Sequence, residues 1–348
     1  MKSVPKDMLR RDDVVWWMQH LEMVDHYVEP ETALTIANWW DDRQGPLILE
    51  GPPGGGKTSL AKRIAELMGV PFYRLQCYKS LGKEESLYDW DKNVQGVLVQ
   101  EAAKNNLLGN DINQIIYQKS AMVLGALAQS LEDEDEDVIV LIDELDKIPS
   151  EEAFEGLLLE FLEEAAITIP ELNSRITPKS GKRPHVVITS NAGRGGLKES
   201  LSHPVLRRGR YIYLPEPEPG RQYCILGQAA PNLPKEVIRD IIAFTVWVKK
   251  TVRMEKPLAL SEVIMWARTL QMCDVKRLDK SVVEATVSEL AKREKDVDRL
   301  LAATNRILKI IHKRYYQNKN VVQFPKQEAS SQEKVTFNQV GTKQVKIS

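Results

Sequence analysis

Residues 47–59 read LILEGPPGGGKTS, and this stretch decides the fold. The apolar residues 47–49 stand between turn-forming residues and predict a short buried strand. Residues 51–58 match the pattern G-x-x-x-x-G-K-S/T at every fixed position. In residues 59–68 the apolar positions then recur at helical spacing. A strand, a glycine-rich loop and a helix in this order predict a phosphate-binding loop and count against a chance glycine-rich turn.

The loop contains the residue types that hold a chain of phosphates. Its glycines let the backbone wrap around phosphates with the N–H groups turned inward, and the helix that begins near Thr58 adds the positive end of its dipole. We expect Lys57 to reach the β- and γ-phosphates of ATP and the Thr58 hydroxyl to ligate Mg²⁺. The predicted ATP-binding residues are Gly51, Pro52, Pro53, Gly54, Gly55, Gly56, Lys57, Thr58 and Ser59.

A second, more hydrophobic strand ends in two acids. Residues 138–142 read VIVLI and are followed by Asp143 and Glu144. A nucleotide hydrolase needs a carboxylate beside its metal and a group that orients water, so we expect Asp143 to hold Mg²⁺ and Glu144 to activate the water. The alternative is a strand that merely ends in acidic residues. Asp146 and Lys147 are expected at the surface or at a subunit interface.

Two further elements complete the predicted catalytic set. Residues 186–189 read as a buried strand that runs into Asn191, whose side chain is expected to hydrogen-bond the attacking water or the γ-phosphate. Arg207 and Arg208 lie just before another predicted strand. An arginine from a neighbouring subunit can stabilise the charge that develops on the γ-phosphate, and Arg208 is the first choice for this role, with Arg207 second. That role implies a ring, whereas the alternative is a solvated basic corner.

Strand and helix signals alternate along most of the chain, which predicts a largely parallel sheet covered by helices on both faces. After the proline-rich hinge at 215–220 the strand signals end and helical spacing continues. We therefore expect an α/β core followed by a small all-α domain. The predicted division is 1–30, an N-terminal helical segment; 31–215, the nucleotide-binding domain; 216–315, the helical lid; and 316–348, a polar tail expected to be disordered.

Other segments carry expectations of their own. Residues 76–131 are expected to be mostly helical with polar breaks, and the six acids of 132–137 to form a solvated, self-repelling loop. Residues 167–178 read as a short hairpin. The tryptophan pairs at 16–17 and 39–40 are expected to pack in the core or between subunits rather than to bind a ligand.

Composition narrows the class of protein. The 348 residues carry a formal net charge of −1, so no basic excess points to nucleic acid. Three scattered cysteines form no disulfide framework and favour a reducing compartment. The sequence holds no apolar run of the ~18 residues that would suggest a membrane span, and no secretory signal is recognisable. We expect a cytoplasmic protein that does not contact a membrane.

These motifs resemble the MoxR group of AAA+ ATPases, and most of all its CoxD-like members, named for carbon monoxide dehydrogenase maturation. The resemblance covers residues 28–270. Its markers are PLILEGPP at 46–53, RLQCY at 74–78, LYDW at 87–90, IDELDK at 142–147, TIPEL at 168–172, TSN at 189–191, LRR at 206–208, KP at 256–257, SE at 261–262 and WAR at 266–268.

The resemblance implies a P-loop NTPase core of the AAA+ type with a small helical lid. Similar proteins form hexameric rings and act as chaperone-like ATPases that mature metalloenzymes and other complexes, often with a partner that bears a von Willebrand factor A domain. The hairpin at 167–178 resembles the family's insert within helix 2, which points toward the ring pore. Residues 193–199 are longer than the family pattern. The usual lid arginine has no clear counterpart, and Arg253 and Arg268 are the candidates.

Three functions are compatible with these features. The first is an Mg-ATP-dependent ATPase that remodels a protein client as a homo-oligomeric ring. The second is a nucleic-acid motor or a nucleotide-gated DNA-binding subunit, which the near-neutral charge disfavours. The third is a non-catalytic nucleotide switch that acts as a scaffold, which the intact Glu144 disfavours.

Overall fold

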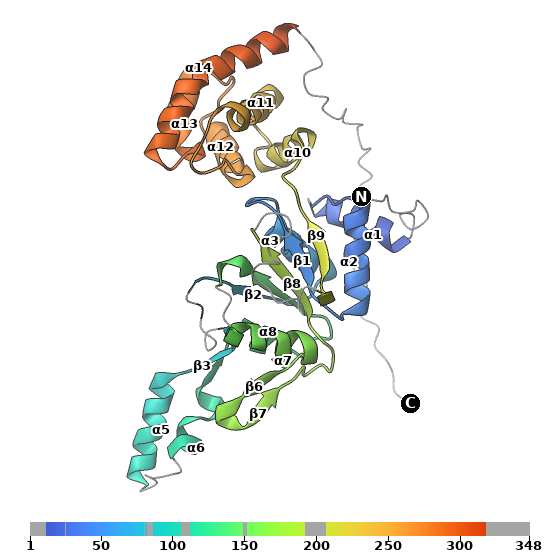
Figure 1. Cartoon of the computed structure of the whole chain (residues 1–348), viewed down its shortest axis with the longest axis vertical. Coiled ribbons are helices and arrows are strands. Elements are labelled where there is room, and N and C mark those ends of the chain that lie inside the picture. Colours follow the sequence, from blue (N-terminus) through green and yellow to red (C-terminus); the bar gives the residue numbers. More distant parts are fainter. Residues whose placement is uncertain are drawn as a thin grey trace. The chain divides into compact units, whose positions relative to one another are not determined.

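The computed structural model of the chain describes residues 12–24, 26–79, 81, 86–105, 112–148, 152–191 and 207–317. The chain divides into two compact units, Met1–Glu216 with Ala259–Ser261, and Pro217–Leu258 with Glu262–Ser348 (Figure 1). The domain boundaries expected at 30, 215 and 315 stay predictions. The expectations for 193–199 and for the tail beyond 317 fall outside the described residues. In the described ranges, no helix has both the length and the apolar character needed to cross a membrane.

A five-stranded parallel sheet forms the centre of the first unit. Its strand order is β2-β5-β8-β1-β9, and each neighbouring pair runs parallel. Every residue of β1, β5 and β8 is buried, which is typical of a parallel sheet covered on both faces. The strands are β1 (Leu47–Glu50), β2 (Phe72–Gln76), β5 (Ile139–Asp143), β8 (His185–Ser190) and β9 (Arg210–Tyr213). Strands β1, β5 and β8 lie within one residue of the bounds predicted at 47–49, 138–142 and 186–189.

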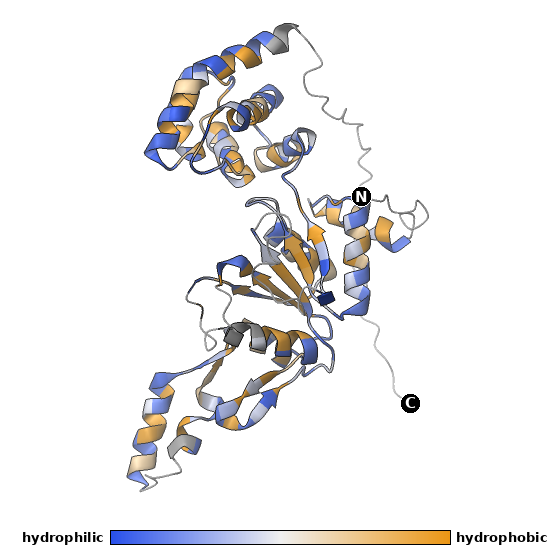
Figure 2. Cartoon of the chain, viewed as in Figure 1, coloured by the Kyte–Doolittle hydropathy of each residue, from blue (hydrophilic) through white to orange (hydrophobic). Residues whose placement is uncertain are grey.

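Alternate residues of a strand point to opposite faces, so the sheet separates two hydrophobic cores. Leu47 and Leu49 belong to the core that contains residues of α1 (Asp12–Met23), α2 (Pro30–Asp42) and α3 (Lys57–Met68). Ile48 belongs to the opposite core, with residues of α7 (Ala126–Glu132) and α8 (Glu152–Glu164). Figure 2 shows apolar residues concentrated in the strands of the sheet. The alternation in the predicted strands therefore sets the layers of an α/β sandwich.

The connection from β2 to β5 is mostly helical in its described residues, as predicted for 76–131, but it also contains two short strands that were not predicted. Strands β3 (Tyr88–Trp90) and β4 (Met122–Leu124) pair antiparallel around α5 (Lys92–Lys104) and α6 (Ile112–Ile116). Each strand has only three residues, which is too short for an alternating pattern to stand out in the sequence.

The hairpin expected at 167–178 is confirmed. Strands β6 (Ile167–Ile169) and β7 (Ser174–Ile176) pair antiparallel around a short 3₁₀ turn. The resemblance assigned this hairpin to the family's insert within helix 2, the helix after the second core strand, which is not α2 of this chain. That assignment is wrong, because the hairpin follows α8 and precedes β8. The segment that interrupts the helical connection after the second core strand is the β3–β4 insertion instead.

The second unit consists of helices in its described residues. Phe244 and Trp266 are fully buried there, with ring centroids 5.6 Å apart, and the Trp266 indole donates to the Thr286 hydroxyl at 2.7 Å. The helices are α10 (Pro219–Ala229), α11 (Lys235–Thr251), α12 (Leu260–Met272), α13 (Lys280–Leu290) and α14 (Glu294–Gln317). The first two residues of α12 belong to the first unit. The predicted fold class, an α/β P-loop core with an all-α region after it, is confirmed.

The tryptophans pack as expected, since Trp17 and Trp39 are buried in the core of the first unit. The ring of Trp40 stacks on that of His185 with centroids 4.0 Å apart and an angle of 4° between the planes. Trp16 stays 37% exposed. These contacts fix α1 and α2 against the sheet.

The acidic run is largely a solvated loop, as expected, but its charges do not simply repel one another. Its carboxylates pair with cations and donors from elsewhere in the same unit, so much of the like-charge repulsion is offset. The pairs are Tyr73 with Asp133, Lys179 with Glu134, Lys182 with Glu136, and Arg43 with Asp137.

Candidate nucleotide-binding site

The phosphate-binding loop joins the end of β1 to the start of α3. Gly54 and Gly56 have φ angles of 79° and 87°, in the left-handed region that favours glycine. A Cβ at Gly55 would lie 3.1 Å from the Pro52 carbonyl oxygen and 3.3 Å from that of Leu214. The glycines predicted from the motif are therefore required by backbone conformation and by close packing.

Lys57 lies inside this loop. Its ammonium donates to the carbonyl oxygens of Gly51 and Pro52, both at 2.9 Å, and the residue is 6% exposed. Burial lowers the pKa of Lys57, and the carboxylates of Asp146, Asp143 and Glu144 oppose that shift. A cation enclosed by a glycine-rich loop fits the binding of a phosphate chain.

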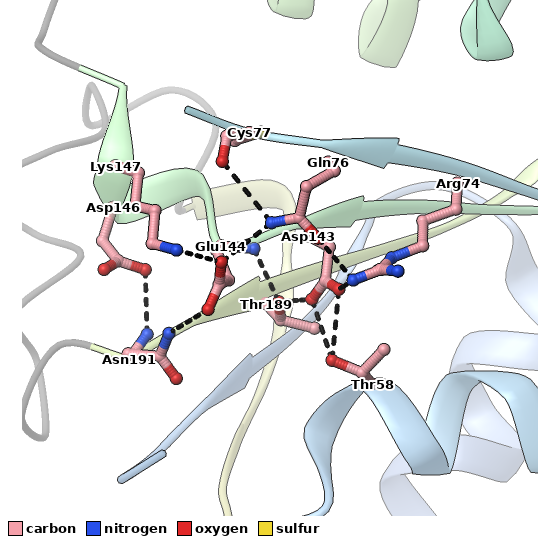
Figure 3. A network of polar contacts seen from close by, with 10 residues as sticks. All are labelled: Thr58, Arg74, Gln76, Cys77, Asp143, Glu144, Asp146, Lys147, Thr189 and Asn191. Atoms are coloured by element: carbon pink, nitrogen blue, oxygen red, sulfur yellow. Dashed lines mark hydrogen bonds and ion pairs between the residues drawn. The ribbon is translucent and has the colours of Figure 1, made fainter. Parts of the chain in front are cut away.

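Asp143 ends β5 and is 1% exposed. The Thr58 hydroxyl lies 3.0 and 3.2 Å from its two carboxylate oxygens, and the Thr189 hydroxyl also donates to it (Figure 3). The parallel register places the carboxyl ends of β5 and β8 beside each other, which brings Asp143 and Thr189 together. A hydroxyl and a carboxylate side by side supply the oxygen ligands that Mg²⁺ takes in nucleotide sites.

Glu144 follows Asp143 in a left-handed backbone conformation, with φ 58° and ψ 48°. Its carboxylate accepts hydrogen bonds from Asn191 Nδ2 at 2.9 Å and from Gln76 Nε2 at 2.8 Å, and it pairs with Lys147 (Figure 3). Burial alone would raise the pKa of Glu144, but the hydrogen bonds from Lys147 and Asn191 outweigh burial and lower it. The group is therefore ionised at neutral pH and suited to accept a proton.

Asn191 stands at the end of β8, as the sequence predicted. Its backbone N–H donates to Asp146 Oδ1 at 2.8 Å, and its side chain reaches Glu144. Asp146 and Lys147 were expected only at the surface or at an interface. The Lys147 side chain is 47% exposed, yet both residues contact the site and help to position Asn191 and Glu144.

The two candidate arginines lie elsewhere in the first unit. Arg207 and Arg208 come just before β9, at the amino edge of the parallel sheet, whereas the loop and Asp143 lie at the carboxyl edge. Arg208 pairs with Glu163 near the end of α8. For Arg207, which is exposed, the described residues provide no hydrogen bond or ion pair. The structure thus brings together Lys57, Thr58, Asp143, Glu144 and Asn191, and it places neither arginine with them.

Sequence reasoning missed three residues of the site: Arg74, Gln76 and Thr189. Thr189 bridges the two acids, because it accepts from the Glu144 backbone N–H at 2.9 Å and donates to Asp143. Gln76 ends β2 and Arg74 lies two residues earlier in the same strand, which pairs with β5 so that Gln76 lies opposite Asp143. A polar residue at the end of a strand next to the acidic strand was the available signal, since parallel strands end at one edge of the sheet.

Comparisons with known proteins agree with this fold. Residues 46–208 match the AAA domain of the dynein-related subfamily. With the parallel sheet and the loop, this match supports an AAA-type nucleotide-binding fold for residues 46–208.

Among individual proteins, the chain is similar to the peroxisomal ATPase PEX6 of Dictyostelium discoideum, at 36% identity over 88 residues. The aligned part is 25% of this chain and only 7% of that protein. A domain of the dynein-related subfamily is compatible with a MoxR-type ATPase, and the CoxD-like assignment stays a prediction.

Proposed function

We propose that this protein binds Mg-ATP in the loop at 51–58, hydrolyses it, and uses the cycle to remodel or mature a protein client as a ring. The observation that carries the proposal is the set of contacts that joins Thr58, Asp143, Glu144 and Asn191 at one edge of the sheet. These four side chains come from α3, from β5, and from the residues that directly follow β5 and β8. Such a convergence of a hydroxyl, two carboxylates and an amide suits phosphoryl transfer to water.

Each residue has a distinct part in this proposal. Thr58 and Asp143 would hold Mg²⁺, which neutralises phosphate charge when it is bound. Glu144 accepts a proton from the attacking water, because its hydrogen bonds keep it ionised. Asn191 orients the Glu144 carboxylate through Nδ2, and its remaining amide oxygen can accept from the same water. Lys57 and the loop glycines bind the phosphates, together with the neighbouring residues Pro52, Pro53 and Ser59.

The position of Arg208 supports a shared active site. The parallel sheet separates it from the loop of its own subunit, because β9 begins at the edge where β1 also begins. An arginine there is available to the nucleotide of a neighbouring subunit, whose transition state it would stabilise. A homo-oligomeric ring, hexameric as in MoxR-type proteins, follows from this role. Arg207 is the second candidate.

The client and further partners are proposed from resemblance. A chaperone-like action on a protein client, with a partner that bears a von Willebrand factor A domain, is what the MoxR-type markers imply. The near-neutral charge gives no support to a nucleic-acid motor.

The substitution Glu144→Gln tests the hydrolytic part of the proposal. Removal of the base should lower steady-state ATP turnover by about 100-fold or more while the affinity for ATP stays within a few fold. Turnover and the binding of a fluorescent ATP analogue are measured on the same preparations. Comparable turnover by the variant and the wild type would refute the assignment of Glu144 and with it the proposed mechanism.

A further inference from the structure

Arg74 is the one cation in direct contact with Asp143 among the described residues. Its Nε and Nη2 atoms lie 2.9 and 2.5 Å from Asp143 Oδ2. Asp143 is almost completely buried, whereas the side chain of Arg74 is 41% exposed. Neither the motifs nor the similarity to known proteins gives Arg74 a role.

The ion pair between Arg74 and Asp143 offsets the large free-energy cost of burying the charge of Asp143. A buried carboxylate without a positive partner loses the solvation of its charge, and the two threonine hydroxyls that also contact Asp143 are neutral. Gln76 orients the guanidinium, because its side-chain oxygen accepts a bond from Arg74 Nη2 (Figure 3). Arg74 therefore provides the positive charge that Asp143 needs.

The same carboxylate cannot serve both the guanidinium and a metal without a cost. Oδ2 of Asp143 already accepts two N–H groups from Arg74 and lies 3.2 Å from the Thr58 hydroxyl, the other proposed metal ligand. A divalent cation at Thr58 and Asp143 would lie within a few ångströms of the guanidinium and repel it. Because Arg74 is on the edge strand β2 and partly exposed, its side chain has solvent to move into.

We propose that Arg74 is a positioning residue that competes with Mg²⁺ for Asp143. It holds the carboxylate in place when no Mg-nucleotide is bound and leaves it when the metal arrives. This inference rests on the proposed function, because it takes Asp143 as a ligand of Mg²⁺. The Mg²⁺ concentration that nucleotide binding requires then depends on the strength of the ion pair between Arg74 and Asp143.

The test is the Mg²⁺ dependence of nucleotide binding, with no turnover involved. A fluorescent ADP analogue is bound to the full chain while MgCl₂ is titrated, and the Mg²⁺ midpoint is compared between the wild type and Arg74→Gln. Loss of the guanidinium should lower the Mg²⁺ midpoint at least about threefold, because the positive charge of Arg74 no longer repels a metal ion a few ångströms away. The melting temperature in EDTA should fall at the same time, since Asp143 loses its partner.

Two further variants serve as controls. Arg43→Gln removes the arginine of another arginine–aspartate pair, with Asp137 at the amino edge of the sheet, and should leave the Mg²⁺ midpoint unchanged. Arg74→Lys keeps the charge but makes fewer hydrogen bonds, so its midpoint should lie between those of the wild type and Arg74→Gln. If Arg74→Gln does not fold, the Arg74→Lys midpoint still decides.

Three outcomes would overturn the inference. An unchanged midpoint with a lower melting temperature would make Arg74 a purely structural partner of Asp143. A raised midpoint, or weak binding at every Mg²⁺ concentration, would make Arg74 a ligand of the nucleotide. If nucleotide binding by the wild type did not depend on Mg²⁺, the proposed metal site itself would be refuted. That result distinguishes failure of the proposed function from failure of this inference alone.

Discussion

The bond between Asn191 and Glu144 gives the sharpest prediction about the chemistry. Asn191 Nδ2 donates to Glu144 Oε1 at 2.9 Å, and the acceptor is an ionised carboxylate. A hydrogen bond to a charged group contributes roughly 1.5–3 kcal/mol. If this bond orients the base in the transition state, Asn191→Ala should lower kcat by about 10- to 100-fold, since ~1.4 kcal/mol corresponds to a factor of ten.

The pH dependence separates this role from a general loss of structure. Burial opposes the lowered pKa of Glu144, and the bonds from Lys147 and Asn191 maintain it. Without the Asn191 bond the pKa of Glu144 rises, so the acid limb of the kcat profile should move to higher pH. Steady-state ATP turnover is measured across pH, with the exposed Asn93→Ala in α5 as the matched control. Wild-type turnover and an unmoved acid limb in Asn191→Ala would refute the reasoning.

Two other predictions concern the arginine and the buried histidine. Arg208→Ala should lower ATP turnover by roughly 10³-fold or more while ATP binding is kept, as expected of an arginine that acts on the transition state; turnover near the wild-type rate would exclude Arg208. Burial lowers the pKa of His185 to about 4 from 6.5, so the folded state favours the neutral ring. Its contribution to the free energy of unfolding is present above pH 6.5 and is lost as the pH falls toward 4, by about 2 kcal/mol between pH 7 and pH 5. Urea unfolding at both pH values should show a smaller loss for His185→Phe than for the wild type, and equal losses would contradict this origin.

The sheet and most of the site could be predicted because each depends on a local pattern. The strands that form the sheet are short apolar runs bounded by turn residues, and the loop motif fixes Lys57 and Thr58 in sequence. Asp143, Glu144 and Asn191 each follow a buried strand. Parallel strands end at one edge of the sheet, so their proximity follows from topology.

The remaining features depend on contacts between segments far apart in sequence. Arg74 and Gln76 face the acids only because β2 pairs with β5, a pairing that their own sequence does not specify. The sequence alone indicates repulsion within the acidic run, because its partners Arg43, Lys179 and Lys182 are far from it in sequence and come close only in the fold. Strands β3 and β4 have only three residues each and are stabilised by pairing with each other. Neither is long enough to show an alternating pattern in the sequence.

ATP turnover by a mixture of two inactive variants tests the central claim, an ATPase ring with active sites shared between subunits. Arg208→Ala keeps Glu144, and Glu144→Gln keeps Arg208, so a mixed assembly contains sites that combine an intact base with a neighbour's intact arginine. The account predicts that the mixture hydrolyses ATP well above either variant alone, in assemblies larger than a monomer by light scattering. A mixture that assembles but stays as inactive as its components, or a wild-type monomer that hydrolyses ATP at the full rate, would contradict it.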